Sequence, residues 1–391
     1  MFYSSLEEMP VMRIIYQMLR RAFKYLSFQN LQKPVIPYTA SNSASAIKKA
    51  INAAASRSFL LILFSAFLLF SCSRGEYRTI RGNALGTFYT ITYLDAKNRD
   101  LQPEAEKILS EIESSLSTYD ENSLISRINR NDTGVVPDKY FVKVFAKAKE
   151  ISGKSGGAFD MTVAPLVNAW GFGFTDASEI DSSYVDSILK YVGYEKVSLK
   201  NQGIEKQYPE IMLDASAIAK GYAVDVVFEH LLALGIEHVM VEIGGEVRAA
   251  GKNPRGISWN IGIDKPVDDS TGIHSELIEI IMLDNKAIAT SGNYRQFYIK
   301  DGVKYAHTIN PATGYPVQHS LLSASVVADD CMTADAWATA FMVMGLEKSR
   351  QLVKNHPELE AYFVYAGKAG EYKLFYTKGF KDYIKGRTFF R

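Results

Sequence analysis

Apolar and polar positions alternate, or recur at helical spacing, along most of the chain after residue 76. Alternation predicts strands over residues 77–95, 196–216, 238–251, 258–264, 276–317, 321–330, 359–367 and 371–380, with turns inside the longer runs. Apolar residues three or four apart predict helices over residues 103–120, 138–157, 220–235 and 332–356. We therefore expect an α+β fold with largely antiparallel sheets and inserted helices.

The N-terminal segment has a different pattern. Lys48, Lys49 and Arg57 precede residues 59–70, which are apolar apart from one serine. A membrane-spanning helix needs about 20 residues, so this run better fits the core of a secretory signal. The run ends in "LFSC" at Cys72, which resembles the lipobox of bacterial lipoproteins. The alternative is a buried core helix that carries a cysteine by chance.

This pattern predicts that the chain divides into three parts. Residues 1–71 are expected to be an N-terminal extension and a lipoprotein signal peptide, and residues 72–78 a lipidated cysteine and a short tether. Residues 79–391 are expected to form the folded domain. A lipid on Cys72 would anchor an exported protein to the periplasmic side of a membrane without spanning it. The inner and the outer membrane both remain open.

The composition bears on two questions: whether a nucleic acid is a partner, and whether a disulfide is present. The 391 residues have a formal net charge of +1, so there is no basic excess to favour nucleic acid. Cys72 and Cys331 are the two cysteines, and with Cys72 assigned to the lipid no structural disulfide is expected.

One helix carries oxygen ligands at helical spacing. Asp335 and Thr339 are four residues apart, so they share one face, and Mg²⁺ prefers a few protein oxygens together with phosphate. The alternative is helix punctuation, in which Thr333 caps the helix and Asp335 favours its dipole.

Three further places combine polar groups with turns. Thr290, Ser291 and Gly292 follow a strand, where hydroxyls and amides can bind a phosphate or the polar edge of a ring, or form an ordinary turn. His307 ends a strand beside a tight turn, which suits either a general base or a surface histidine. Gly244 and Gly245 lie between strand residues and permit a bulge or a close backbone approach.

A series of stretches, in order, resembles the ApbE family, the FAD:protein FMN transferases. They are "ALGTFYTITY", "STYDENSLISRIN", "GGAFDMTVAPLVNAWGFG", "DASAIAKGYAVD", "VEIGGEV", "AIATSGNYRQF", "HTINPATGYPV" and "ADAWATAFMVMG", which together run from about Leu85 to Gly345. The resemblance implies two lobes with an FAD cleft between them. It also implies Mg²⁺-dependent transfer of FMN from FAD to a threonine or serine hydroxyl of an acceptor flavoprotein, such as a subunit of a membrane redox complex, with release of AMP.

The resemblance also implies roles for individual residues. His307 matches the family's base, and Lys220 matches a lysine near the phosphates. Asp335, Thr339 and the carbonyl of Ala219 match the metal ligands. The positions that match contacts to the flavin or the nucleotide are Leu85, Tyr119, Ala158, Phe159, Asp160, Ser216, Tyr222 and Ile309.

The chain departs from the family pattern at three positions. Leu85 stands where members often have Met, Asn310 replaces an Asp before Pro311, and Ala338 stands where some members supply a second Asp to the metal. Two other functions stay open: an FAD pyrophosphatase that uses water as the acceptor, and a periplasmic FAD-binding lipoprotein without activity.

Overall fold

The computed structural model describes residues 75–173, 180–200, 203–267, 276–294, 297–300 and 303–385. The chain separates into two compact units, Met1–Ser73 and Arg74–Arg391, and every described residue belongs to the second. The predicted signal peptide and Cys72 therefore lie outside the described residues. The first strand begins at Glu76, so Glu76 to Arg78 belong to the fold and not to the tether predicted over residues 72–78.

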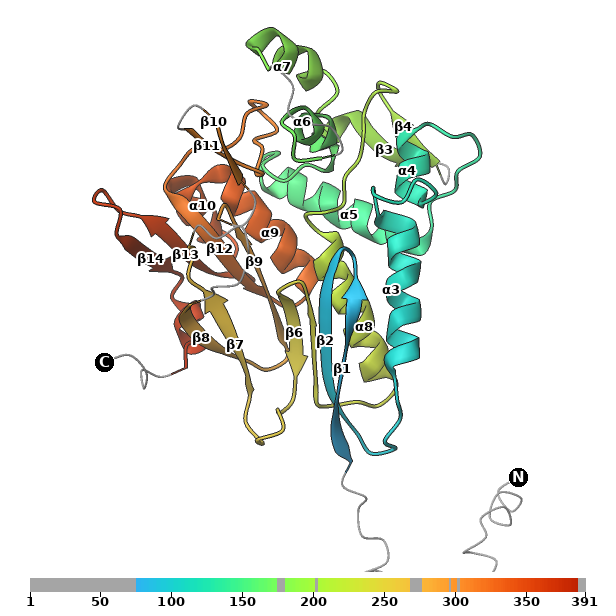
Figure 1. The fold of residues 1–391 in the computed structure, drawn as a ribbon, viewed down its shortest axis with the longest axis vertical. Coiled ribbons are helices and arrows are strands. Elements are labelled where there is room, and N and C mark those ends of the chain that lie inside the picture. Colours follow the sequence, from blue (N-terminus) through green and yellow to red (C-terminus); the bar gives the residue numbers. More distant parts are fainter. Residues whose placement is uncertain are drawn as a thin grey trace, which may run out of the picture. The chain divides into compact units, whose positions relative to one another are not determined.

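An eight-stranded sheet forms the centre of the fold, in the order β1-β2-β5-β6-β9-β12-β13-β14 (Figure 1). Each of its neighbouring strands pairs antiparallel, as the sequence predicted. The strands are β1 (Glu76–Ala84), β2 (Thr87–Asp95), β5 (Val239–Ile243), β6 (Glu246–Ala250), β9 (Lys286–Gly292), β12 (Leu321–Ala328), β13 (Glu360–Ala366) and β14 (Tyr372–Tyr376).

The other strands of the described residues form three small antiparallel sheets. They are β3 (Val197–Lys200) with β4 (Gly203–Lys206), β7 (Trp259–Asp264) with β8 (Leu277–Leu283), and β10 (Phe297–Lys300) with β11 (Val303–Ala306). The predicted turn between β3 and β4 includes residues 201–202, which lie outside the described residues.

The helices are inserted between the strands, which is the α+β arrangement. They are α3 (Gln102–Leu116), α4 (Leu124–Asn129), α5 (Lys139–Lys154), α6 (Ala164–Ala169), α7 (Ser182–Leu189), α8 (Ala219–Ala233), α9 (Cys331–Met344) and α10 (Leu346–Val353), with 3-10 turns at Met161–Val163, Tyr194–Lys196 and Gly379–Asp382. Within the described residues, no helix has the length and apolar character needed to cross a membrane.

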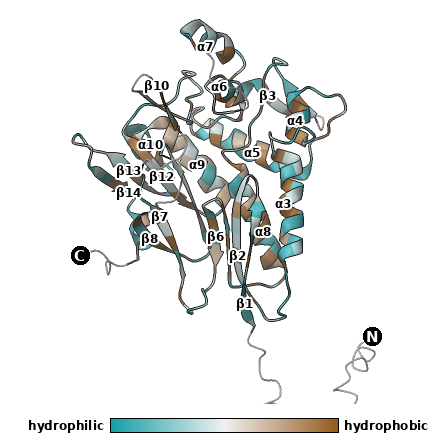
Figure 2. Cartoon of the chain, in the orientation of Figure 1, coloured by the Kyte–Doolittle hydropathy of each residue, from teal (hydrophilic) through white to brown (hydrophobic). Residues whose placement is uncertain are grey.

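Strand alternation builds a core on each face of the large sheet. Along β12, Val326 belongs to the main cluster with α8 and α9, whereas Val327 belongs to the cluster under β7 and β8. Most residues of α8 and α9 are buried, because the sheet and other helices cover much of their surface, and Figure 2 shows apolar segments on both helices. This burial fixes the two helices that carry Lys220 and Asp335.

The helix predicted over residues 332–356 is two helices. Gly345 separates α9 from α10 with φ 74°, a left-handed conformation that ends a helix. Asp330, and not Thr333, caps α9, because its side chain accepts from the amide of Thr333. The suggested capping role of Thr333 is therefore wrong.

Candidate functional site

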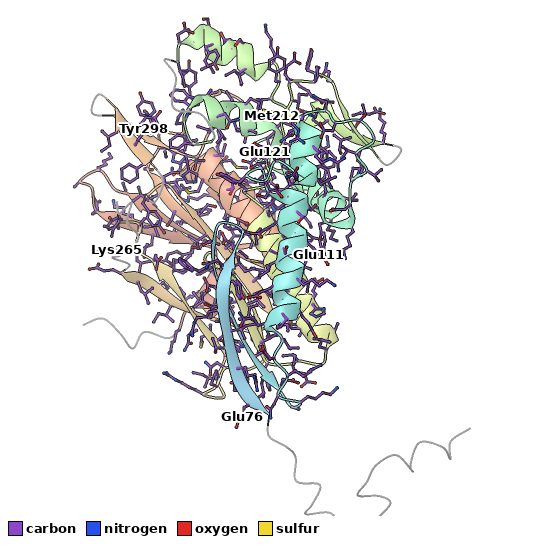
Figure 3. All side chains as sticks on the ribbon, turned by 45° about the vertical axis from the view of Figure 1, so that its right-hand side comes forward. Glu76, Glu111, Glu121, Met212, Lys265 and Tyr298 are labelled. Carbon is purple, nitrogen blue, oxygen red and sulfur yellow. The ribbon has the colours of Figure 1, made fainter. Side chains whose placement is uncertain are left out.

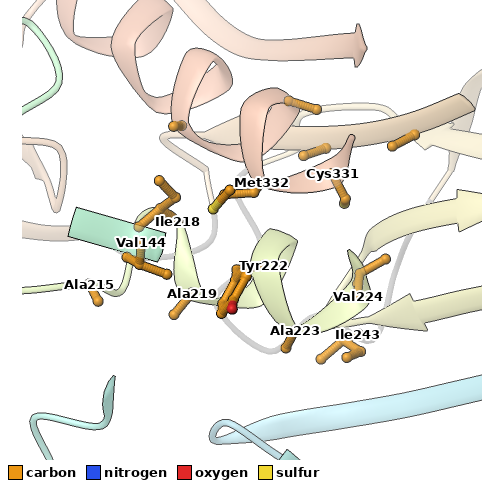
Figure 4. Packing of buried hydrophobic residues seen from close by; sticks show 14 of the residues in the cluster. Val144, Ala215, Ile218, Ala219, Tyr222, Ala223, Val224, Ile243, Cys331 and Met332 are labelled. Atoms are coloured by element: carbon orange, nitrogen blue, oxygen red, sulfur yellow. The ribbon is translucent and has the colours of Figure 1, made fainter. Parts of the chain in front are cut away.

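The small residues of "DASAIAKGYAVD" bring α8 against α9. A Cβ on Gly221 would lie 2.4 Å from the carbonyl oxygen of Cys331 and 2.8 Å from Cβ of Asp335, so only glycine allows this approach. The Gly221 amide donates to Oδ2 of Asp335 at 3.0 Å. Figure 4 shows Ala219 and Tyr222 on α8 beside Met332 and Cys331 at the start of α9.

Asp335 and Thr339 lie one turn apart on α9, as the spacing predicted. Asp335 is only 2% exposed, and the Thr339 hydroxyl lies 3.2 Å from the Ser291 hydroxyl on β9. Ser291 belongs to the hydroxyl-rich stretch noted in the sequence, although this stretch ends a strand and is not a separate turn. The preceding Thr290 is bonded at 2.7 Å to Ser325 of β12.

Lys220 reaches across to Glu246, a residue that the sequence did not single out. Its ammonium lies 3.3 Å from Oε1 of Glu246 at the start of β6. Burial opposes the charge on Lys220, but the carboxylates of Glu246 and Asp335 outweigh burial and raise the pKa of Lys220. Burial and the charge of Asp335 raise the pKa of Glu246, whereas Lys220 opposes that rise. Lys220 therefore stays protonated, and its one positive charge lies beside two carboxyl groups, those of Glu246 and Asp335.

The glycine pair 244–245 forms the two-residue turn between β5 and β6. Both residues have positive φ, 64° and 101°, which glycine adopts without strain. A Cβ on Gly244 would lie 2.8 Å from Thr87 and 3.2 Å from Cδ of Lys220. The close backbone approach that the sequence suggested is therefore to the stem of Lys220.

The loop before α8 is tied to the "AFD" stretch. The Asp214 amide donates to the carbonyl of Met161 at 2.8 Å, and the Ser216 hydroxyl donates to Oδ1 of Asp214 at 2.6 Å. Ala219 is the first residue of α8. A carbonyl at this position accepts one helical hydrogen bond and keeps its second lone pair for another partner.

The "AFD" residues have structural partners of their own. Phe159 is buried in the main core, and Ala158 is partly buried. Asp160 accepts from the amide and hydroxyl of Thr162 and from the amide of Tyr194, at 2.7–2.8 Å. Burial raises the pKa of Asp160, and these hydrogen bonds oppose the rise. A flavin contact by this carboxylate would therefore add to an existing network.

Three other candidates differ in exposure. Leu85 has φ 51° in the tight turn between β1 and β2 and is partly buried. The Tyr119 side chain is 74% exposed. Tyr222 is buried, its ring 6.3 Å from that of Tyr140 on α5, and Tyr140 in turn donates to Glu111, which Figure 3 labels on α3. Burial in this core accounts for Tyr222 without a ligand.

His307 lies beside a cluster of aromatic rings. The ring of Phe172 is 6.5 Å from the imidazole and 5.2 Å from Tyr298, which is labelled in Figure 3. Ile309 is buried in the small cluster that contains Trp170. These contacts place His307 at the edge of an apolar surface.

One side-chain hydrogen bond links the residue after His307 to the residue that follows β9. The hydroxyl of Thr308, the residue after His307, donates to Asn293 at 2.8 Å, and Asn293 follows Ser291 by two positions. The structure thus places Ala219 and Lys220 at the start of α8 and Asp335 and Thr339 on α9, which packs against it, while the His307 segment is joined to the end of β9 through Thr308.

This site offers oxygen donors for a cation. Among the described residues, no three His, Cys, Asp or Glu side chains gather as metal ligands. A carboxylate, a hydroxyl and a carbonyl are nevertheless donors that suit Mg²⁺, which keeps waters and phosphate oxygens in its shell. Oε2 of Glu246 is buried without a hydrogen-bond partner in the described part of the chain, so an unsatisfied oxygen acceptor lies beside the site. The donor set fits Mg²⁺.

Known proteins match this chain over the same region. The ApbE family model matches residues 85–363. An FAD:protein FMN transferase of Vibrio cholerae is 38% identical over 302 residues, which cover 75% of this chain and 89% of the relative. The enzyme of the same description from Escherichia coli is 30% identical over 321 residues, 79% of this chain and 90% of the relative.

Solved structures agree with the sequence matches. The flavin transferase ApbE from Vibrio cholerae superposes with a TM-score of 0.70 at 35% identity, covering 79% of this chain and 99% of that one. The apo flavinyl transferase ApbE of Pseudomonas stutzeri gives 0.71 at 31% identity, covering 79% and 97%. The mixed fold with mostly antiparallel sheets is confirmed, while the two lobes and the cleft between them stay a prediction. The chain belongs to the ApbE family.

Proposed function

We propose that this chain transfers FMN from FAD to a threonine or serine hydroxyl of an acceptor flavoprotein and releases AMP, with Mg²⁺ as cofactor. The observation that carries the proposal is the junction of α8 and α9. There the Gly221 amide donates to Asp335, the charge of Asp335 acts on the neighbouring Lys220, and Thr339 follows Asp335 by one turn of α9. The ApbE family model matches the chain across this junction, over residues 85–363.

Asp335, Thr339 and the carbonyl of Ala219 would hold the Mg²⁺. When bound, Mg²⁺ supplies charge neutralisation to the pyrophosphate, which favours phosphoryl transfer. Asp335 suits this role because its carboxylate is held by the Gly221 amide before any ligand arrives.

Lys220 would bind a phosphate oxygen of FAD. Its ammonium stays protonated, and the start of α8 adds the positive end of a helix dipole. Both features would favour a phosphate at this place once a cation offsets the charge of the neighbouring carboxylates.

His307 would act as the general base. It would take the proton of the acceptor hydroxyl as the hydroxyl oxygen forms a bond to the FMN phosphorus. The bond from that phosphorus to the oxygen of AMP then breaks, and AMP leaves with the electron pair. The imidazole of His307 lies 6.5 Å from the ring of Phe172. The next residue, Thr308, donates a hydrogen bond to Asn293, which follows β9.

The test is the intact mass of an acceptor domain with a candidate threonine, after incubation with the chain, FAD and Mg²⁺. We expect a gain of one FMN, which Asp335→Ala and His307→Ala each abolish. Free FMN and AMP with every acceptor unmodified would instead establish a pyrophosphatase. Bound FAD without any product would establish a carrier.

We also propose that the chain is an exported lipoprotein anchored through Cys72. The support is the basic lead and the apolar run before "LFSC". Cys72→Ala should abolish metabolic labelling with a fatty acid and release the protein from the membrane fraction. Unchanged labelling in this variant would exclude Cys72 as the lipidated residue.

A further inference from the structure

The first turn of α8 lies between two buried carboxylates. On one side the Gly221 amide donates to Asp335 at 3.0 Å, and on the other the Lys220 ammonium lies 3.3 Å from Glu246. Glu246 is 4% exposed, which is nearly as buried as Asp335. The two acidic groups therefore face the same short stretch of backbone.

The strand register fixes the position of Glu246. It pairs with Ile243 directly after the tight turn of Gly244 and Gly245, so its side chain points to the face of the sheet that α8 covers. The same turn lies against the stem of Lys220. The pair of Lys220 and Glu246 is thus built by the fold and does not depend on a flexible surface contact.

The formal charges do not balance. When both carboxyls are ionised, Asp335 and Glu246 contribute two negative charges against the one positive charge of Lys220, and burial together with this imbalance raises the pKa of Glu246 to about 8. Oε1 of Glu246 meets the ammonium, but Oε2 is buried and has no hydrogen-bond partner among the residues that the structure describes. A buried carboxylate oxygen without a partner is costly. An added cation would relieve that cost, whereas an added phosphate anion would increase it.

We propose that Glu246 is a positioning residue that makes FAD binding depend on a divalent cation. It holds the Lys220 ammonium in place and neutralises it, so that the dianionic pyrophosphate meets a site of net negative charge until the cation enters. The proposal rests on the function proposed above and adds the residue that couples the two ligands. Such coupling is reciprocal: the cation strengthens FAD binding by the same factor as FAD strengthens cation binding.

The test measures FAD affinity by flavin fluorescence at about pH 9, above the pKa of about 8 to which burial raises Glu246, with the full chain in detergent, once with excess Mg²⁺ and once with EDTA. The dissociation constant of FAD in EDTA, divided by the dissociation constant in Mg²⁺, reports the coupling and is called the ratio below. Glu246→Gln should lower this ratio by about tenfold, because it removes one buried negative charge. Lys220→Gln should raise the ratio, because it leaves both carboxylates unopposed. Glu242→Gln is the matched control, since Glu242 lies on the same hairpin but bonds to the amide of Gly245.

The outcomes separate the two proposals. A ratio near one in the unaltered chain would remove the role of Mg²⁺ and with it the coupling. A ratio that falls in Asp335→Asn but not in Glu246→Gln would overturn only the role of Glu246. If Glu246→Gln fails to fold in a thermal melt, Lys220→Gln decides the question, because a ratio that stays constant or falls in that variant contradicts the proposal.

Discussion

The amide of Gly221 donates to the carboxylate of Asp335 at 3.0 Å, and this bond joins the first turn of α8 to the middle of α9. The carboxylate is oriented by backbone before it meets a ligand, which is how rigid elements hold a preorganised site. Because Gly221 also permits the helices to approach, one glycine both packs the core and orients the candidate metal ligand.

Replacing Gly221 with alanine should therefore destabilise the protein. The new Cβ would meet the Cys331 carbonyl at 2.4 Å, and backbone cannot move aside as a flexible side chain can. We expect a loss of about 1–3 kcal/mol in the free energy of unfolding, measured in urea.

Gly153→Ala is the matched control for this prediction. Gly153 lies inside α5, and nothing lies within 4 Å of the Cβ that alanine would add. Alanine should stabilise that helix by up to about 1 kcal/mol. Equal effects of the two substitutions would show that the contact with α9 does not constrain Gly221.

Part of this site could be predicted from the sequence. The spacing of Asp335 and Thr339 follows from helical geometry alone, and Gly244 and Gly245 indicated a close backbone approach. Glu246 was missed because its role depends on the pairing of β5 with β6 and on the packing of α8 over them. An acidic residue directly after the glycine pair was the available signal.

The fold, like the site, could be predicted from the sequence only in part. Periodicity located most strands and the long helices, because each buries one face or stripe. It missed α4 (Leu124–Asn129), α6 (Ala164–Ala169) and α7 (Ser182–Leu189), which are too short to show a repeat. The order of the sheet, in which β6 lies beside β9, depends on tertiary packing that no local pattern contains.

Thr339→Val should weaken the response to Mg²⁺ while leaving the fold intact. The substitution removes the hydroxyl that faces Ser291 and keeps the branched shape, so stability should change by about 1 kcal/mol at most. We expect transfer to require about tenfold more Mg²⁺, measured as initial rate against Mg²⁺ concentration. Thr339→Ser keeps the hydroxyl and should behave like the parent. An unaltered Mg²⁺ response in the valine variant would remove Thr339 from the ligand set.

Asp95 should make stability fall in acid. Arg99 donates to both of its carboxylate oxygens, at 2.8 and 2.9 Å, and these bonds hold the pKa of Asp95 below its usual value despite burial. The unfolded carboxyl gains its proton near its ordinary pKa of about 4, so this stabilisation is complete above that pH and is lost as the pH falls below it.

The variant Asp95→Asn tests this expectation. Its free energy of unfolding near neutral pH should be lower by about 1–3 kcal/mol, because Arg99 loses a mostly buried partner. Urea unfolding below about pH 4 should show a smaller difference between the two proteins, since the parent has then lost the same interaction. A difference that stays constant with pH would show that the loss comes from packing and not from charge.

Asp225 should control the position of α9, and through it the site. This buried carboxylate of α8 accepts from the amides of Cys331 and Met332 at the start of α9, at 2.9 and 2.8 Å, and from Arg248 at 2.7 Å. Asparagine has one acceptor oxygen in place of two and no charge, so Asp225→Asn leaves at least one of the two amides unpaired and removes the negative charge beside Arg248. We expect a loss of about 2–4 kcal/mol in unfolding free energy and weaker Mg²⁺ dependence of transfer, because Asp335 lies on the next turn.

The control is Glu229→Gln, whose exposed carboxylate is the second partner of Arg248 at 3.2 Å and should contribute under about 1 kcal/mol. If both variants lose equally little stability, the cap of α9 is supplied by Asp330 alone.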